Sequence, residues 1–166
     1  YSIEFPNGGL SLVIGNVIQQ GPATENPSIA SYGAEGFKHP LNELYFINNT
    51  VVNDRPAGGI FIFVRAGAGA VRIVNNIFSG RGDLLRGPGE LRSNVVAARS
   101  EFLDPEHFDY RLKASAAAIG RAVDPGSAHG FALRPTAQYA HKAREGIRIN
   151  AGKLDAGALE YRRERR

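Results

Sequence analysis

The sequence of 166 residues contains no cysteine, no methionine and no tryptophan. Without cysteine, the chain can form neither a disulfide framework nor a thiolate metal site, and it has no cysteine nucleophile. Its apolar runs are short, and none approaches the roughly 18 residues that a membrane span requires. The chain also opens without a signal-peptide pattern. These absences predict a globular protein without a membrane span, and the length suits a single domain.

Positive charge is concentrated near the C-terminal end of the sequence. Residues 1–132 hold 11 Lys and Arg against 12 Asp and Glu, whereas residues 133–166 hold nine against four. A basic terminus can bind nucleic acid or an acidic polymer, or it can be a solvated end. Nucleic-acid recognition also calls for a known module or for aromatic residues interleaved with the basic ones. Neither is evident, so we expect no nucleic-acid partner.

Four segments of the sequence share an asparagine between two short apolar runs. They are residues 12–18, 45–51, 72–78 and 90–96, aligned on Asn16, Asn49, Asn76 and Asn94. The runs are rich in Val, Ile and Phe and are bounded by Gly, Pro, Asn and Asp, which indicates strands rather than helices. Asparagine tolerates the left-handed backbone of a sharp turn, and stacked copies can hydrogen-bond to one another. The pattern predicts a solenoid of parallel strands with an asparagine ladder.

A third apolar segment follows the asparagine in the first two repeats. Counting sixteen residues onward from Asn16 and from Asn49 aligns residues 28–33 with residues 61–66, and residues 83–87 form a shorter version in the next repeat. Each repeat is therefore expected to contribute three strands, with loops of unequal length projecting outward.

The repeats and the C-terminal motifs together resemble a right-handed parallel β-helix of the pectate-lyase-like kind. Residues 102–120 are similar to the closing segment of secreted bacterial β-helix proteins, with its D-P, D-Y-R-L and S-P-A-I-D-x-G motifs, although Ala117 replaces the proline and Gly120 the aspartate. Residues 154–161 are similar to the D-x-G-A-x-E-Y with which many such chains finish.

The resemblance implies an all-β fold with about four coils over residues 1–100. Residues 101–166 then form a closing segment and an irregular strap in the same domain, with Tyr139 and Leu154 as anchors. It also implies the C-terminal part of a longer bacterial protein that is secreted, periplasmic or on the cell surface. An uncapped first coil permits end-to-end self-association, because an open strand edge can pair with another chain.

The third strands supply the first candidate site. The alignment places Tyr32, Arg65 and Arg86 in one outward row, with Phe61 and Phe63 facing the same way. The resemblance implies a substrate groove along such a strand face. A tyrosine and two arginines can hold a sugar ring and its carboxylates, since guanidinium binds a carboxylate in a planar, bidentate manner. The alternative is that these residues end their strands and point into solvent or pair with Glu35 and Asp83.

The second candidate site is the loop of residues 35–40. His39 can act as an acid or base near neutral pH, and Lys38 can neutralise a carboxylate. The alternative is a polar turn set by Pro40.

The sequence gives no support for a metal or a cofactor. Most carboxylates are isolated, and the histidines lack zinc-site spacing. Asp104, Glu106 and Asp109 do lie close together, but a structural role in the closing segment explains them better.

Three functions remain open, and no catalytic residue is assigned. The chain can act on polysaccharide, as a lyase of uronate polymers does. It can also bind an acidic polysaccharide without turnover, or form a structural stalk or cap of a surface protein. Whether it is an enzyme is left undecided, because fold alone does not fix function.

Overall fold

The computed structural model describes residues 1–140, 142, 144–149 and 152–162, and its main feature is three parallel sheets of four strands each. The first sheet contains β1 (Ile3–Phe5), β4 (Ser28–Tyr32), β7 (Ile60–Val64) and β10 (Asp83–Arg86). The second contains β2 (Leu10–Ile14), β5 (Glu43–Ile47), β8 (Val71–Val74) and β11 (Glu90–Arg92). The third contains β3 (Val17–Gln20), β6 (Thr50–Asn53), β9 (Ile77–Gly80) and β12 (Val95–Val96).

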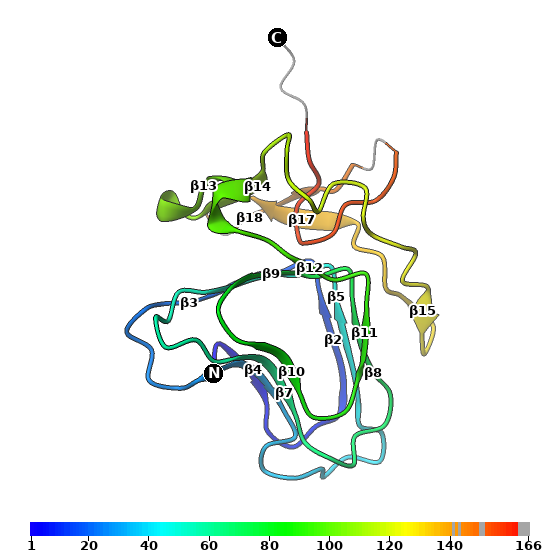
Figure 1. Ribbon diagram of the computed structural model, residues 1–166. Coiled ribbons are helices and arrows are strands. Elements are labelled where there is room, and N and C mark those ends of the chain that lie inside the picture. Colours follow the sequence, from blue (N-terminus) through cyan, green and yellow to red (C-terminus); the bar gives the residue numbers. More distant parts are fainter. Residues whose placement is uncertain (141, 143, 150–151, 163–166) are drawn as a thin grey trace.

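The chain passes through the three sheets in turn, and each strand pairs with the strand three positions later in the order. Figure 1 looks along the stack, so that the strands of each sheet overlap and the three sheets surround a common interior. This arrangement is compatible with a parallel β-helix, as the sequence predicts.

The predicted asparagine ladder is present at the turn between the second and third sheets. The Oδ1 atom of Asn49 accepts the backbone N–H of Asn16 at 2.9 Å. The Oδ1 atom of Asn76 does the same for Asn49 at 2.8 Å, and that of Asn94 for Asn76 at 2.9 Å. Each side-chain amide of the last three asparagines also donates to a backbone carbonyl inside the stack.

The left-handed backbone, however, belongs to the residue that precedes each ladder asparagine. Gly15, Asn48, Asn75 and Ser93 have φ angles of 73°, 51°, 60° and 53°. The ladder asparagines are therefore selected for their side-chain hydrogen bonds, whereas the left-handed conformation is adopted one position earlier.

Apolar side chains from all three sheets fill the interior. In the second sheet, Val13, Phe46 and Ile73 lie in register on adjacent strands and are buried. Phe61 and Phe78 meet edge to face, with ring centroids 5.1 Å apart. Complete burial of each such side chain stabilises the fold by about 1.5–3 kcal/mol.

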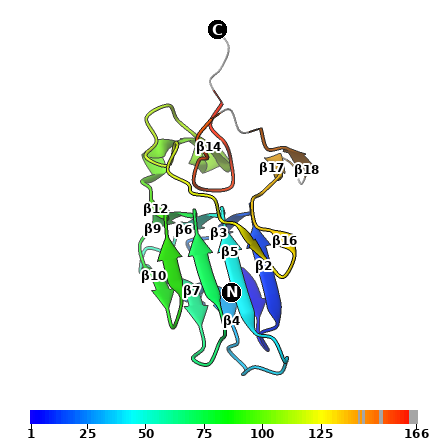
Figure 2. The same cartoon turned by 90° about the vertical axis from the view of Figure 1, so that its right-hand side faces the viewer.

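The rest of the chain lies outside the three sheets. It comprises two short 3-10 turns, η1 (Arg99–Glu101) and η2 (Pro105–His107), and the antiparallel pairs β13 (Phe102–Asp104) with β14 (Asp109–Leu112), β15 (Ser127–Ala128) with β16 (Phe131–Ala132), and β17 (Ala137–Ala140) with β18 (Arg144–Ile147). Figures 1 and 2 show most of this segment above the third sheet, on its outer face, with the β15–β16 hairpin beside the second sheet.

The left-handed asparagines attach the C-terminal segment to the stack. Asn75 exchanges two hydrogen bonds with Val123, at 2.7 and 3.0 Å, and its carbonyl accepts the N–H of Gly157 at 2.7 Å. A Cβ at Gly157, whose φ is +88°, would lie 2.4 Å from Cδ1 of Ile77. Only glycine therefore lets the strap approach the third sheet this closely.

The D-x-G-A-x-E-Y motif of residues 154–161 closes on itself through its two acids. Asp155 accepts the N–H groups of Gly120 at 2.6 Å and Tyr161 at 2.8 Å. Glu160 forms a fully buried ion pair with Arg148 at 2.7 Å. Burial raises the pKa of Glu160, and the attraction of Arg148 opposes that rise.

The anchors of the strap are therefore not the expected ones. Tyr139 is 37% exposed and Leu154 is half-buried, whereas Ala156, Ala158 and Leu159 are buried. The two alanines permit close packing against the sheet because their side chains are small.

The β15–β16 hairpin is held to the second sheet by Glu43. This carboxylate accepts a hydrogen bond from the Tyr45 hydroxyl at 2.6 Å, and it lies 2.8 Å from Nε2 of His129. These two hydrogen bonds lower the pKa of Glu43. Burial, together with the hydrogen bond and charge of Glu43, raises the pKa of Tyr45 to about 12.

Candidate functional site

The predicted row of Tyr32, Arg65 and Arg86 is not assembled. Strand pairing places Tyr32 opposite Val64, and Phe63 opposite Arg86. The loop before β7 has six residues where the loop before β4 has seven, so the sixteen-residue count places Arg65 one position too far along. A shift of one residue exchanges the two faces of a strand.

Tyr32 is buried in the interior rather than presented to a ligand, so its predicted outward position is wrong. Its ring packs against Phe5 and Phe37, with centroids 6.2 and 5.6 Å away. Its hydroxyl donates to the carbonyl of Gly9 at 2.5 Å. Burial raises the pKa of Tyr32 to about 12, which fits a structural phenol.

The other residues of the row lie at the surface without forming a common site. Arg86 pairs with Asp83 at 2.7 Å, and both side chains are about 60% exposed. Arg65 donates to the carbonyl of Ala34 at 3.2 Å, and Phe63 is half-buried beside Arg86. The pairing of Arg86 with Asp83 is the alternative that the sequence left open.

The loop of residues 35–40 presents Lys38 and His39 to solvent. Phe37 holds the loop in place by packing on Tyr32. Neither Lys38 nor His39 lines either of the two cavities described next.

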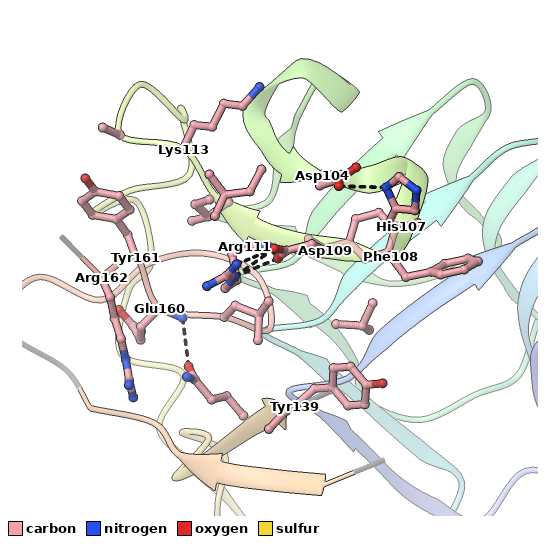
Figure 3. A pocket seen from close by; sticks show the side chains of 18 residues that line it. Asp104, His107, Phe108, Asp109, Arg111, Lys113, Tyr139, Glu160, Tyr161 and Arg162 are labelled. Atoms are coloured by element: carbon pink, nitrogen blue, oxygen red, sulfur yellow. Dashed lines mark hydrogen bonds and ion pairs between the residues drawn. The ribbon is translucent and has the colours of Figure 1, made fainter. Parts of the chain in front are cut away.

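A hollow with a volume of about 1020 Å³ lies in the C-terminal segment. We call it the closing groove. One side of the groove is formed by β13, η2 and β14, and the other side by β17 and residues 159–162, as Figure 3 shows. Leu112 and Leu159, which belong to a buried cluster, and Val17 of the third sheet contribute apolar surface.

Aromatic side chains border this apolar surface. Phe108, Tyr139 and Tyr161 all line the closing groove and come from three different segments. In Figure 3, Tyr161 lies toward the end that holds Lys113 and Arg162, and Phe108 lies at the opposite end. Flat aromatic faces with a polar rim are suited to binding ligands that are apolar on one side and polar on the other, as sugars are.

All three carboxylates that line the groove are paired. Asp109 makes a bidentate contact with Arg111, with distances between 2.6 and 3.1 Å. Asp104 lies 2.8 Å from Nδ1 of His107, and Glu160 is paired with buried Arg148.

Two cations of the groove are not neutralised in this way. Lys113 donates to the carbonyl of Ser100 at 2.9 Å, and Arg162 donates to the carbonyl of Ile147 at 3.1 Å. Within the described residues, neither forms an ion pair with a carboxylate. Such cations remain available to an anionic ligand.

Phe108 has an unusual backbone. It follows η2 with φ 62° and ψ 21°, the left-handed conformation that usually selects glycine at the end of a helical turn. A bulky side chain in this conformation costs about 1–2 kcal/mol. The ring is nevertheless 57% exposed, so its burial does not explain its presence.

A second cavity, of about 380 Å³, is also lined by Phe108. We call it the Asp54 cavity. Gln19 and Arg99 both donate to Asp54, and Arg99 also donates to Glu106 at 3.1 Å. The Asp54 cavity thus contains two carboxylates around one guanidinium.

The arrangement is suited to binding more clearly than to a particular reaction. His107 and Asp104 form the one His–carboxylate pair among the groove's described lining residues, and both are exposed. In the described part of the chain, no group of three or more His, Asp or Glu is placed to hold a metal ion. The same residues contain no helix long and apolar enough to cross a membrane.

Sequence reasoning missed this site because it treated residues 101–113 as closing structure. Arg111, Lys113 and Phe108 stand within six positions of one another, and that mixture of basic and aromatic residues was the available signal. Their meeting with Tyr139 and Arg162 could not be seen from spacing.

Comparison of the chain with profiles of known protein families, with curated proteins and with solved structures finds no match.

Proposed function

We propose that this chain is a right-handed parallel β-helix of the pectate-lyase-like kind, with about four coils, that binds an acidic polysaccharide in the closing groove. The fold part of the proposal is supported by three parallel sheets visited in turn and by the asparagine ladder. Polymers of this class are met outside cells, so the proposal includes a secreted, periplasmic or cell-surface location.

The observation that carries the binding proposal is the composition of the closing groove. Lys113 and Arg162 can each donate to a sugar carboxylate, since neither is occupied by an acid of the described residues. Phe108 and Tyr139 border the same space and can stack on sugar rings. An aromatic and cationic groove over an apolar floor is complementary to a chain of acidic sugars.

Affinity electrophoresis tests the proposal. The parent chain is run through gels that contain pectate, alginate, a glycosaminoglycan or a neutral glucan at physiological salt. We expect retardation by at least one acidic polymer and none by the glucan. Lys113→Ala and Arg162→Ala should each weaken binding at least about tenfold, because a hydrogen bond to a charged group contributes roughly 1.5–3 kcal/mol.

Arg65→Ala and Arg86→Ala are the matched controls, because they remove exposed cations of the other candidate site. Their mobility should equal that of the parent in every gel. Retardation that is lost in Arg65→Ala but kept in Lys113→Ala would move the site to the first sheet. Equal mobility of the parent in all gels would refute binding and leave a structural stalk or cap.

The same mixtures distinguish binding from lyase activity. Elimination from a uronate polymer creates a double bond that absorbs in the ultraviolet, whereas binding alone creates none. We expect no increase in absorbance, because the one His–carboxylate pair among the described lining residues, Asp104–His107, is exposed to solvent.

A further inference from the structure

The two cavities that meet at Phe108 differ in charge. The closing groove offers Lys113 and Arg162 to a carboxylate. The Asp54 cavity instead places Asp54 and Glu106 around Arg99, so one cation faces two carboxylates. A negatively charged sugar is attracted to the first and repelled by the second.

Uncharged sugars are better suited to the Asp54 cavity. A sugar hydroxyl can donate to a carboxylate and accept from a guanidinium or from an amide such as Gln19. The carboxylates of Asp54 and Glu106 and the guanidinium of Arg99 provide both kinds of partner within about 380 Å³. The cavity can therefore bind hydroxyl groups without requiring an anion.

Phe108 lines both cavities. Figure 3 shows its ring beyond the Asp104–His107 pair, at the end of the closing groove. Glycine would adopt its backbone, with φ 62°, without strain. The ring belongs to none of the buried clusters formed by the described residues, so core packing does not account for it.

We propose that Phe108 is a stacking platform between a cationic subsite and a hydroxyl-binding subsite, and that the ligand is a polysaccharide in which a carboxylate-bearing sugar alternates with an uncharged one. This inference rests on the proposed function, because it assumes that a polysaccharide occupies the closing groove. It adds the residue that the two cavities share and the charge pattern of the ligand.

The absence of tryptophan from the chain provides a direct probe. In the variant Phe108→Trp, all tryptophan fluorescence comes from position 108. We expect its intensity or wavelength to change when hyaluronan, which alternates glucuronate with N-acetylglucosamine, is added. Phe131→Trp is the matched control, because Phe131 is 56% exposed but lies on the β15–β16 hairpin, and its fluorescence should not respond.

The charge pattern is tested by comparing hyaluronan with polygalacturonate, in which every sugar carries a carboxylate. We expect the parent chain to bind hyaluronan at least about tenfold more tightly, since like charges would face each other at the Asp54 cavity. Glu106→Gln should narrow this difference by strengthening the binding of polygalacturonate. Glu106 is 77% exposed, so its loss should leave the fold intact.

Phe108→Gly and Phe108→Tyr separate the ring from the backbone. Phe108→Gly should bind hyaluronan about tenfold more weakly while its Tm stays equal to or above that of the parent, because glycine relieves the left-handed strain. Phe108→Tyr should bind like the parent. A Tm several degrees lower in Phe108→Gly would make the ring structural and overturn the proposal.

The outcomes also distinguish this inference from the proposed function. If the parent binds and Lys113→Ala weakens binding, but Phe108→Gly binds normally or both polymers bind equally, only the platform is refuted. If the parent chain binds neither hyaluronan nor polygalacturonate and is not retarded in any of the gels, the proposed function fails and this inference fails with it.

Discussion

Replacing Asn49 by alanine is the sharpest test of the asparagine ladder. The side chain is fully buried and makes four hydrogen bonds. Its Oδ1 atom accepts from the backbone and the side chain of Asn16, and its Nδ2 atom donates to the carbonyl of Val13 and to Oδ1 of Asn76.

The cost of Asn49→Ala can be worked from the groups that lose a partner. The carbonyl of Val13 lies inside the stack and the N–H of Asn16 is partly buried, so water does not readily replace the amide at either one. Each unsatisfied buried group costs about 1–3 kcal/mol, and the partly buried N–H of Asn16 lies at the low end of that range, so we expect the free energy of unfolding to fall by about 2–4 kcal/mol. At about 2–4 °C per kcal/mol for a chain of this size, Tm falls by roughly 5–15 °C.

Urea unfolding followed by circular dichroism measures this change. Asn16→Ala is the matched control, because Asn16 belongs to the same ladder but is exposed at its end, where water can replace the lost bonds. Its effect should stay within about 0.5 kcal/mol. If Asn49→Ala costs no more than Asn16→Ala, the ladder does not stabilise the stack and the reasoning is wrong.

Two further predictions concern the attachment of the C-terminal segment. Gly157→Ala should destabilise the chain by about 1–3 kcal/mol, because its Cβ would overlap Cδ1 of Ile77. Limited proteolysis should then cleave the strap sooner in this variant than in the control Gly126→Ala, where the added Cβ meets no atom within 4 Å. The pKa of Glu43 in the folded state lies below its ordinary value of 4.5. The stability that the ionised carboxylate contributes is therefore fully present above pH 4.5 and is lost as the pH falls through the folded-state pKa. Tm should therefore fall more between pH ~6 and pH ~3 in the parent than in Glu43→Gln, and equal slopes would contradict the assigned hydrogen bonds.

Sequence reasoning found the stack of strands because the repeat is local and periodic. Asn16, Asn49, Asn76 and Asn94 each sit between apolar runs, and apolar residues that recur at fixed distances from the asparagine lie in register on adjacent strands. Residues within a few positions of the asparagine were therefore assigned the correct partners on the adjacent strands, since no loop lies between them and the asparagine.

Prediction failed where a loop of variable length had to be crossed. The count from Asn49 to Arg65 crosses a loop that is one residue shorter than the corresponding loop of the first repeat. Arg65 was therefore predicted to lie beside Tyr32, whereas Val64 lies there in the structure. Because the two faces of a strand alternate, the predicted outward row included a tyrosine that lies in the core.

The amino-acid sequence alone therefore determined that the chain is built from stacked parallel strands with an asparagine ladder, since both depend on neighbours in the repeat. Tertiary structure alone decided where the C-terminal segment lies and which side chains meet there. Phe108 and Arg162 are 54 positions apart in the sequence, yet both line the closing groove. Their meeting depends on the hydrogen bonds by which Asn75 and Gly157 join the strap to the third sheet, and contacts between such distant segments leave no periodic pattern in the sequence.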